Sequence, residues 1–392
     1  MDWSFLIKGK ESLNVTTDSR KVTAGCIFVA LKGEHFDGND YVDQAKAAGA
    51  SYILSGENAL SDLQDLARAW RRELGLPILG ITGTNGKTTT KELCAAVLKT
   101  KYPLYYTQGN YNNSLGVPLT LLSITRAHEL AIVEMGASHP GDIKELVEIA
   151  EPNCGLITNV GKAHLQGFGS FEGVQRTKAE LYDFLIAHGG TIFRNADNPY
   201  LEHMLEEAQK TNAKGQMSLI DYHTGTMPEG THLVGAYNAE NISAAICVGQ
   251  YFGVSNEEAL AAIRAYIPSN NRSQLMQTAH NTIVVDAYNA NPTSMQAAIN
   301  VFKGDTYILG AMRELGDYSH LEHQNIVNML LERKADRVLL IGPEYRETTA
   351  PYPIFENVEE LCTFLQQNPI SGAHILLKGS RSNQLEKVLP LL

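Results

Sequence analysis

The sequence has few cysteines and no long apolar run. Its five cysteines are far apart and form neither a Cys-x-x-Cys pair nor a zinc-binding spacing. We therefore expect buried free thiols in a reducing compartment. No apolar run approaches the ~18 residues that indicate a membrane span, and the first twelve residues lack the apolar stretch and cleavage site of a signal peptide. These absences predict a cytoplasmic protein without membrane insertion.

The chain also lacks an excess of basic residues. It carries 43 acidic and 32 basic side chains, for a net charge of -11. A nucleic-acid scaffold would need a basic face, so we expect no nucleic-acid partner. A local basic pocket for a small anion remains compatible with this charge. The 44% hydrophobic content is enough for several cores, and 392 residues suggest two or three domains.

Three zones follow one another along the chain. Residues 1–75 combine a short strand at 25–31 with helices near 41–48 and 62–74, which indicates a small α/β unit. From Pro77, apolar strands alternate with amphipathic helices, the pattern of a parallel sheet; the expected strands are "PILGITG", "LYYTQG", "LAIVEMG", "CGLITNVG" and "GTIFRN". A Pro/Ser/Asn cluster at 266–274 indicates a linker. A second alternating set follows it, with expected strands "TIVVDAY", "TYILGAM", "RVLLIG" and "HILLKGS". We predict three α/β domains: residues 1–75, 76–268 and 269–392.

The clearest motif is "GITGTNGKTTTKEL", residues 80–93, where an apolar strand runs into glycines and then into a helix. Glycines let backbone N–H groups curve around phosphate oxygens, and a helix N-terminus adds favourable partial charge. Ile81 replaces the first glycine of the usual G-x-x-x-x-G-K-[ST] pattern, but it falls in the strand, outside the loop. A glycine-rich turn with a surface lysine is the less favoured alternative. We predict that the phosphates of a nucleotide bind to Gly83, Thr84, Asn85, Gly86, Lys87, Thr88 and Thr89.

Polar side chains follow the next strands of this zone. Glu134 ends the apolar strand "LAIVE". At this position a carboxylate is expected to act, beside the Thr88 hydroxyl, as a second protein ligand of a phosphate-bound Mg²⁺. His164 lies just beyond another strand, and Lys178 and Glu180 lie near the start of a helix. From the residues alone, His164 is better explained as a hydrogen-bonded loop residue, and Lys178 as part of an exposed, ion-paired face.

Later strand–helix junctions also carry polar residues. Asn238 and Asn241 are three residues apart in "GAYNAENISAAICVG", so their amides either contact an adenine edge or cap the helix. Asp286 ends a buried strand, and Asn291-Pro292 is typical of a helix start. "LLKGSRSNQLEKVL" places a lysine, a serine and an arginine where an anion could bind. Structural roles stay open for all of these positions.

Taken together, these motifs resemble the Mur ligases, the ATP-dependent enzymes that form amide bonds in peptidoglycan precursors. The similarity covers nearly the whole chain, and it is specific in the order and spacing of its motifs. They include "DSRKVTAGCIFVALKGEHFDGNDYVDQAKAAGA", "GITGTNGKTTTKEL", "GNYNNSLGVPLTLL", "EMGASHPGDI", "TNVGKAHLQGFGSFEGV", "TKAEL", "YNAENISAA", "DAYNANPTSM" and "LKGSRS". A generic phosphate-loop protein would share only the second.

The resemblance implies a fold, a reaction and two substrates. The central P-loop domain with a mostly parallel sheet would stand between a small N-terminal domain and a C-terminal Rossmann-like domain. The motifs are most similar to the family member that joins D-alanyl-D-alanine to UDP-N-acetylmuramoyl-tripeptide through an acyl phosphate. We expect a monomer. Two alternatives are another ligase of the superfamily, either the one adding the third amino acid or a folylpolyglutamate synthetase, and a nucleotide-switch ATPase.

The resemblance also implies roles for individual residues. ATP and two Mg²⁺ ions are expected, with Lys178 carbamylated by CO₂ so that it becomes an oxygen ligand. The implied metal ligands are Thr88, Glu134, His164 and Lys178. The implied catalytic residues are Lys87, His164, Lys178 and Arg272. The implied nucleotide contacts outside the loop are Asn238, Asn241, Arg272 and Asp286.

Substrate contacts are implied at both ends of the chain. For the UDP-linked peptide they are Ser19, Arg20, Asp37, Asn112 and Asn113. For the C-terminal domain, which would help to receive the dipeptide, they are Asn289, Asn291, Lys378, Ser380 and Arg381. Two positions depart from the family pattern: Tyr237 stands where histidine is common, and Ala311 replaces a usual acidic residue.

Overall fold

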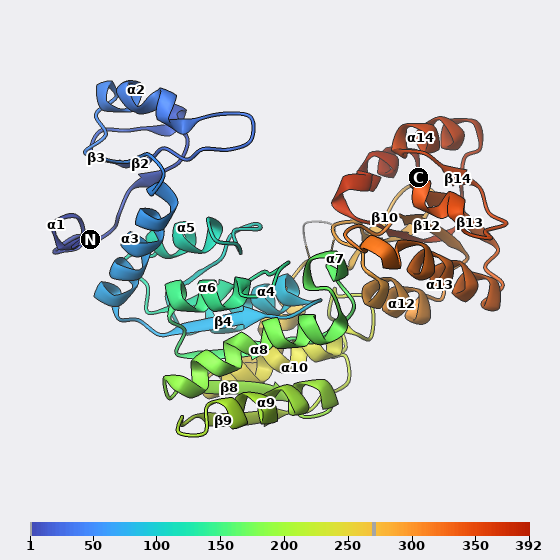
Figure 1. Ribbon diagram of the computed structural model, residues 1–392. Coiled ribbons are helices and arrows are strands. Elements are labelled where there is room, and N and C mark those ends of the chain that lie inside the picture. Colours follow the sequence, from blue (N-terminus) through green and yellow to red (C-terminus); the bar gives the residue numbers. More distant parts are fainter. Residues whose placement is uncertain (1, 269–271) are drawn as a thin grey trace. The chain divides into compact units, whose positions relative to one another are not determined.

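The computed structural model describes residues 2–268 and 272–392, which form two compact units (Figure 1). The first unit comprises Met1–Gly83, Leu98–Ile157 and Arg176–Tyr222, and the second comprises Thr84–Val97, Thr158–Gln175 and His223–Leu392. Residues 269–271, part of the linker predicted at 266–274, lie outside the described residues. None of the five cysteines forms a disulfide within the described residues, as the sequence predicted; four of them are buried, and Cys362 is partly exposed.

The first unit begins with a small parallel sheet. Its strands, in the order β1-β2-β3, are Val15–Thr16, Ile27–Val29 and Tyr52–Leu54. The segment between β2 and β3 forms η2 (Gly38–Tyr41) and α2 (Val42–Ala47), close to the helix expected at 41–48. Phe28 of β2 and Ala45 of α2 share the small core of this layer.

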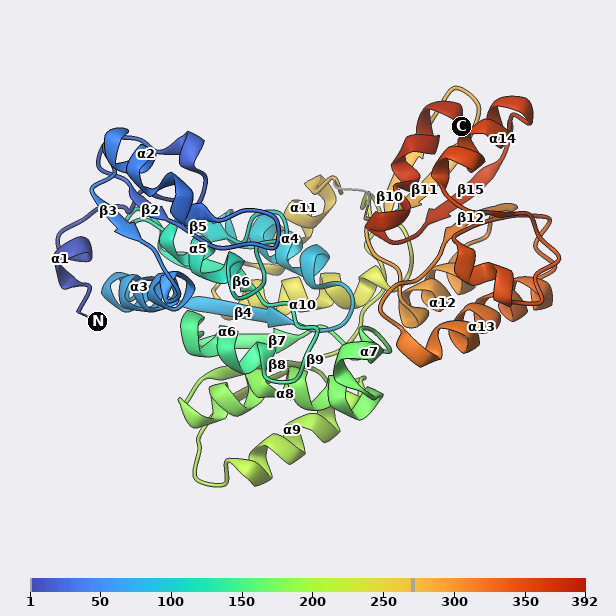
Figure 2. The same ribbon diagram turned by 45° about the horizontal axis from the view of Figure 1, so that its top comes forward.

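The second sheet of this unit has six strands, all parallel (Figure 2). In spatial order they are β5 (Leu104–Tyr106), β6 (Leu130–Glu134), β4 (Ile78–Thr82), β7 (Cys154–Ile157), β8 (Thr191–Asn195) and β9 (Ser218–Tyr222). Every residue of β4, β6 and β7 is buried. Continuous apolar runs are typical of strands covered on both faces, which is why the sequence predicted them. The edge strand β9 is mostly exposed and was not predicted.

Helix α3 (Ala59–Leu74) packs against α5 (Gly116–Leu122) and α6 (Asp142–Ala150). Buried Trp70 donates its indole N–H to the Ile124 carbonyl at 2.9 Å. Buried Arg71 donates to the carbonyl of Glu151, which directly follows α6, at 2.9 Å. The helix that the sequence placed with the N-terminal zone therefore packs on helices of the central sheet.

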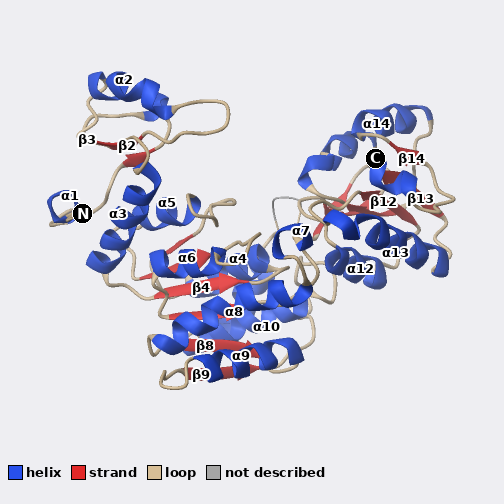
Figure 3. Cartoon of the chain, viewed as in Figure 1, coloured by secondary structure: helices blue, strands red, loops and turns tan. Residues whose placement is uncertain are grey.

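The second unit contains a mixed six-stranded sheet (Figure 3). In spatial order the strands are β10 (Gln274–Gln277), β11 (Thr282–Asp286), β15 (His374–Lys378), β12 (Thr306–Gly310), β13 (Arg337–Ile341) and β14 (Ile354–Phe355). Only β10 pairs antiparallel; the other pairs are parallel. The sequence predicted the four inner strands. It missed the two edge strands, which are short and only partly buried.

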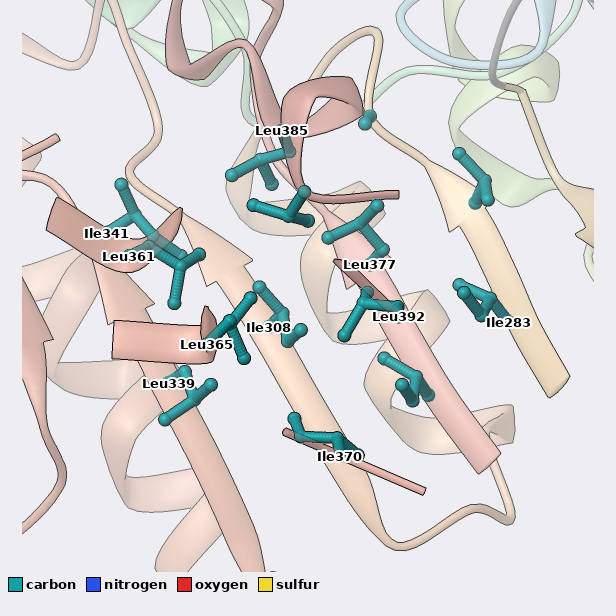
Figure 4. Packing of buried hydrophobic residues seen from close by; sticks show 14 of the residues in the cluster. Ile283, Ile308, Leu339, Ile341, Leu361, Leu365, Ile370, Leu377, Leu385 and Leu392 are labelled. Atoms are coloured by element: carbon teal, nitrogen blue, oxygen red, sulfur yellow. The ribbon is translucent and has the colours of Figure 1, made fainter. Parts of the chain in front are cut away.

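Helices cover both faces of this mixed sheet. On one face, α14 (Val358–Gln367) and η6 (Leu385–Leu391) bury leucines against Ile308 and Leu377 of the sheet (Figure 4). On the other face, α12 (Pro292–Val301) and α13 (Ser319–Glu332) pack against the strands in a second core. Two separate apolar cores thus fix the strand ends, where the predicted substrate residues lie.

Further α-helices occur along the chain. They are α1 (Ser4–Ile7), α4 (Lys87–Leu98), α7 (Leu165–Phe168), α8 (Phe171–Ala187), α9 (Pro199–Thr211), α10 (Asn238–Tyr251) and α11 (Asn256–Ala265). In the part of the chain that the structure describes, none of the helices has the length and apolarity needed to cross a membrane.

A buried histidine makes the stability of the second unit depend on pH. The His323 ring is fully buried; its Nδ1 donates to the Ser319 carbonyl at 2.7 Å and its Nε2 accepts from the Met312 N–H at 3.0 Å. Burial lowers the pKa of His323 below the ordinary histidine value. Below about pH 6.5 the unfolded chain therefore binds a proton that the folded chain does not, and the free energy of unfolding falls by at most about 1.4 kcal/mol per pH unit.

We expect the urea midpoint of the whole chain to drop between about pH 7.5 and about pH 5.5 for this reason. His323→Gln should be less stable at the higher pH but should lose less stability across the same interval. The matched control is His203→Gln, because His203 is exposed on α9. If His323→Gln and the control show the same pH dependence as the unmodified chain, the buried ring is not the group responsible.

Candidate nucleotide and substrate site

The glycine loop follows the central strand directly. β4 ends at Thr82 and α4 begins at Lys87. Gly83 and Gly86 have φ angles of 140° and 78°. A Cβ atom on Gly86 would lie 2.4 Å from the Asn241 amide oxygen, so only glycine fits there. Ile81 is a fully buried residue of β4, which confirms that the departure from the usual motif lies in the strand.

The segment after β7 supports this loop. The Thr84 N–H donates to the Asn159 carbonyl at 2.9 Å, and the Asn85 N–H donates to the Asn159 side-chain oxygen at 3.0 Å. Thr158 Oγ1 donates to the Asn85 carbonyl at 2.6 Å. Sequence reasoning missed Thr158 and Asn159. Their position at a strand end beside β4 was the only signal, because the bonds go to loop backbone far away in sequence.

Within the loop, Lys87 Nζ donates to the Thr84 carbonyl at 3.0 Å. Its ammonium group therefore lies over the loop, where phosphate oxygens would gather. The Thr88 side chain is almost buried in the first turn of α4, and Thr89 is more exposed. The backbone N–H groups that follow Asn85 and the N-terminus of the twelve-residue helix α4 form an arrangement suited to an anion.

Glu134 ends β6, the strand beside β4. The strand register pairs it with Ile81, and its side chain is buried. Asn112 Nδ2 donates to Glu134 Oε1 at 2.9 Å, and the Glu134 N–H donates to Thr107 Oγ1 at 3.0 Å. Asn112, predicted as a substrate contact, thus orients this carboxylate. Its neighbour Asn113 accepts from the N–H of Gly116, the first residue of α5, at 2.8 Å.

The chemistry of these donors fits a magnesium ion. No group of three or more His, Cys, Asp or Glu side chains gathers as a metal site among residues 2–268 and 272–392. Mg²⁺ does not need such a group, because it takes one or two protein oxygens together with phosphates and water. A buried carboxylate and a threonine hydroxyl are ligands of this kind.

His164 and Lys178 belong to different compact units. His164 directly precedes α7 with a φ of 49°, and its Nδ1 is hydrogen-bonded to the Glu314 carboxylate. Lys178 lies in α8 and is 2% exposed, so it is not on the exposed face that the residues alone suggested. Glu180 accepts from the backbone N–H groups of Gly141 and Lys144 at the start of α6. The joint metal role of His164 and Lys178 stays a prediction.

Asn238 and Asn241 are buried in the first turn of α10. Asn238 Nδ2 donates to the Val234 carbonyl at 2.7 Å, and Asn241 Nδ2 donates to Asn238 Oδ1 at 2.9 Å. Asn241 Oδ1 accepts from Thr90 Oγ1 at 3.0 Å. The two amides thus connect α10 to the phosphate-loop helix. Their predicted contact with adenine stays a prediction.

In the C-terminal sheet, Asp286 and Lys378 pair across the adjacent ends of β11 and β15. Lys378 Nζ lies 2.6 Å from Asp286 Oδ2 and donates to the Asn289 carbonyl at 3.2 Å. Ser380 Oγ bonds Asn383 and the Ala311 carbonyl, at 2.6 and 3.2 Å. Three predicted substrate residues and one predicted nucleotide residue therefore gather at these strand ends.

Two predicted arginines meet at one aromatic ring that the sequence reasoning did not select. The Arg272 guanidinium carbon lies 3.7 Å from the centre of the Tyr288 ring, and that of Arg381 lies 5.6 Å from it. Asn291 caps α12, and its Nδ2 donates to Asn85 Oδ1 of the phosphate loop at 2.8 Å. This hydrogen bond joins Asn291 to the phosphate loop within the second unit.

The predicted contacts near the N-terminus lie on two loops of the small sheet. The exposed Arg20 guanidinium donates to the Asp18 carboxylate at 2.9 Å, which lowers the pKa of Asp18 to about 2. Ser19 is part of the same 3-10 turn. Asp37 accepts from the Asn39 N–H and side chain, and these hydrogen bonds lower its pKa. The substrate roles of Ser19, Arg20 and Asp37 stay predictions.

A parallel sheet whose central strand runs through a glycine loop into a helix defines a nucleotide-binding α/β protein. Three family models match this chain: the Mur ligase family, catalytic domain, at 13–97; the Mur ligase middle domain at 81–220; and the Mur ligase, glutamate ligase domain, at 271–381. Together with the curated relative described next, these matches show that the chain belongs to the Mur ligase family.

That relative is the UDP-N-acetylmuramoyl-tripeptide–D-alanyl-D-alanine ligase of Bacillus subtilis. It is 34% identical, and the match covers 96% of this chain and 92% of the relative. Among solved structures, MurF from Acinetobacter baumannii is 29% identical with a TM-score of 0.85, covering 96% and 92% of the two chains. MurF ligase from Thermotoga maritima, in complex with ADP, is 27% identical with a TM-score of 0.84, covering 98% of both. The predicted three-domain α/β fold is confirmed.

Proposed function

We propose that this protein uses ATP to join D-alanyl-D-alanine to UDP-N-acetylmuramoyl-tripeptide. The observation that carries the nucleotide part is the loop between β4 and α4, where Gly86 is held at a positive φ against Asn241. Similarity over nearly the full length to ligases with this name supports the two substrates. We place the reaction in the cytoplasm and the protein in the monomeric state; elution as a dimer in gel filtration would contradict the latter.

The loop and its lysine would hold the phosphates of ATP. Backbone N–H groups of residues 86–88 and the ammonium group of Lys87 would neutralise charge on the phosphates as the γ-phosphoryl group moves. Arg272 would contact the same phosphates. Asn238 and Asn241 would support the loop from α10, beside the adenine.

We expect two magnesium ions. Thr88 and Glu134 would hold one ion, and His164 with a carbamylated Lys178 would hold the other. Bound magnesium would neutralise phosphate charge. Burial supports the carbamate, because a buried lysine favours its neutral amine, the form that reacts with CO₂.

The reaction would proceed in two steps. An oxygen of the tripeptide's terminal carboxylate attacks the γ-phosphorus of ATP, the bond from that phosphorus to the bridging oxygen breaks, and ADP leaves. The amine of D-alanyl-D-alanine then attacks the acyl carbon, loses a proton, and expels inorganic phosphate as the amide forms. Phosphorylation is needed because an amine that attacked a free carboxylate would have to displace an oxide ion, which is a very poor leaving group. Exclusion of water would protect the acyl phosphate from hydrolysis.

Phosphate release by the purified chain tests this function. With ATP and Mg²⁺, we expect release only when both UDP-N-acetylmuramoyl-tripeptide and D-alanyl-D-alanine are present. Release that needs the tripeptide but accepts a single amino acid instead of the dipeptide would favour another ligase of the superfamily. Release without either acceptor would favour a nucleotide-switch ATPase and would contradict the proposal.

A further inference from the structure

Tyr237, the residue that departs from the family pattern, joins two segments of the second unit. Its hydroxyl shares a hydrogen bond of 2.9 Å with Ser273 Oγ. Its ring packs over Gly235, where a Cβ atom would lie 2.4 Å from the ring. Burial raises the pKa of Tyr237 above the ordinary tyrosine value, so the phenol keeps its proton at neutral pH. An antiparallel bridge between Leu233 and Gln274 lies beside this bond.

Ser273 has a backbone conformation that serine seldom adopts. Its φ is 46°, in the left-handed region, and only 5% of the residue's surface is exposed. Such a conformation is unfavourable for a non-glycine residue, and it persists only where surrounding contacts hold it. Two described contacts can hold Ser273 in this conformation. One is the hydrogen bond between its side chain and the Tyr237 hydroxyl, and the other is the backbone bridge at the next residue, Gln274.

Tyr237 is itself well supported. It directly precedes α10, and the first turn of that helix is connected through Asn238 and Asn241 to Thr90 of the phosphate-loop helix. Asn238 also bonds the Val234 carbonyl, next to Leu233 of the bridge. These hydrogen bonds, together with the short segment from Leu233 to Asn238, link the phosphate-loop helix to Ser273.

Arg272 directly precedes Ser273 in the chain. The conformation at Ser273 sets the direction in which the backbone passes from Arg272 into β10, and the Arg272 guanidinium lies over Tyr288. We propose that the Tyr237 hydroxyl is a positioning group: it holds Ser273 in the left-handed conformation and so aims Arg272 at the phosphates of ATP. This inference rests on the proposed function through the role of Arg272.

The test compares Tyr237→Phe, Ser273→Gly and the double variant. Glycine adopts positive φ without help, so a glycine at 273 should make the hydroxyl unnecessary. Tyr237→Phe should raise KM for ATP and the Kd of a non-hydrolysable ATP analogue with Mg²⁺ roughly five- to tenfold, the effect of one buried hydrogen bond. Ser273→Gly should change both by less than about threefold, and Tyr237→Phe should add nothing in the glycine background.

Tyr345→Phe is the matched control. Tyr345 is fully buried, and its hydroxyl has no hydrogen-bond partner among the described residues. The substitution removes the same atom from a tyrosine elsewhere in the second unit and should leave KM for ATP unchanged. If Tyr237→Phe does not fold, Ser273→Ala removes the same bond from the other side and should raise KM at least as much.

Several results would overturn the proposal. Tyr237→Phe could keep the original KM and Kd while only its melting temperature falls, which would mean a purely structural bond. Its loss could also be equally large with glycine at 273, which would mean that the backbone of Ser273 is not involved. Binding of the ATP analogue needs neither acceptor substrate. A chain without dipeptide-dependent turnover would therefore refute the proposed function while the binding data still decide the role of Tyr237.

Discussion

Replacing Lys178 by alanine is expected to lower the rate of dipeptide-dependent phosphate release by about 100-fold or more. Loss of a residue that hydrogen-bonds to a metal ligand costs about 10–100-fold, and loss of the ligand itself should cost more. Lys178 is 2% exposed in α8, so circular dichroism is used first to establish that the alanine variant folds. Short carboxylates such as acetate should restore part of the rate, because they can return an oxygen ligand to the space.

A second measurement reports on the carbamate itself. After equilibration with ¹³C-bicarbonate, the unmodified chain should show a carbamate carbon signal that Lys178→Ala and Lys178→Arg lack. Lys214→Ala, at an exposed position, should keep both the signal and the rate. A signal that survives in both Lys178 variants, or an unchanged rate in Lys178→Ala, would show that this lysine does not carry the group.

Replacing Asp286 by alanine is expected to lower the free energy of unfolding by about 3–5 kcal/mol, the cost of leaving a buried charge without its partner. Lys378 is 1% exposed, and Asp286 Oδ2 lies 2.6 Å from its ammonium nitrogen. Without the carboxylate, that ammonium keeps only the Asn289 carbonyl as a described partner. Urea unfolding of the full chain, followed by circular dichroism, gives the difference.

Two further variants interpret that loss. Adding Lys378→Met to Asp286→Ala should recover most of the stability, because the buried charge is then absent. The exposed pair of Lys387 and Glu359, at 2.7 Å, is the matched control, and Glu359→Ala should cost much less stability than Asp286→Ala. Equal losses for Asp286→Ala and Glu359→Ala, or no recovery in the double variant, would show that burial of Lys378 is not the cause.

Much of the fold could be predicted because the buried strands are continuous apolar runs. β4, β6 and β7 of the central sheet and the four inner strands of the C-terminal sheet were recognised in this way. The missed strands, β1, β3, β9, β10 and β14, are edge strands. An edge strand gains its ladder from one neighbour and buries little, so local sequence gives it a weak signal.

The phosphate loop could be predicted because all its parts are adjacent in sequence. The groups that support it could not, since Asn159 and Asn241 reach the loop from distant segments. The role of Asn112 beside Glu134 depends on the order of strands in the sheet. Lys178 shows a further limit: one-dimensional spacing suggested an exposed face, whereas packing of α8 buries the residue.

The packing of α3 decides where this chain could be shortened. A fragment starting at residue 76 would lose Trp70 and Arg71, whose hydrogen bonds to Ile124 and Glu151 anchor the helix on α5 and α6. The apolar surface that α3 now covers would then face water and would favour aggregation. A fragment starting just before Ala59 would keep this cover while omitting the small N-terminal sheet. The first sheet could therefore be removed or exchanged by cutting the chain between β3 and α3.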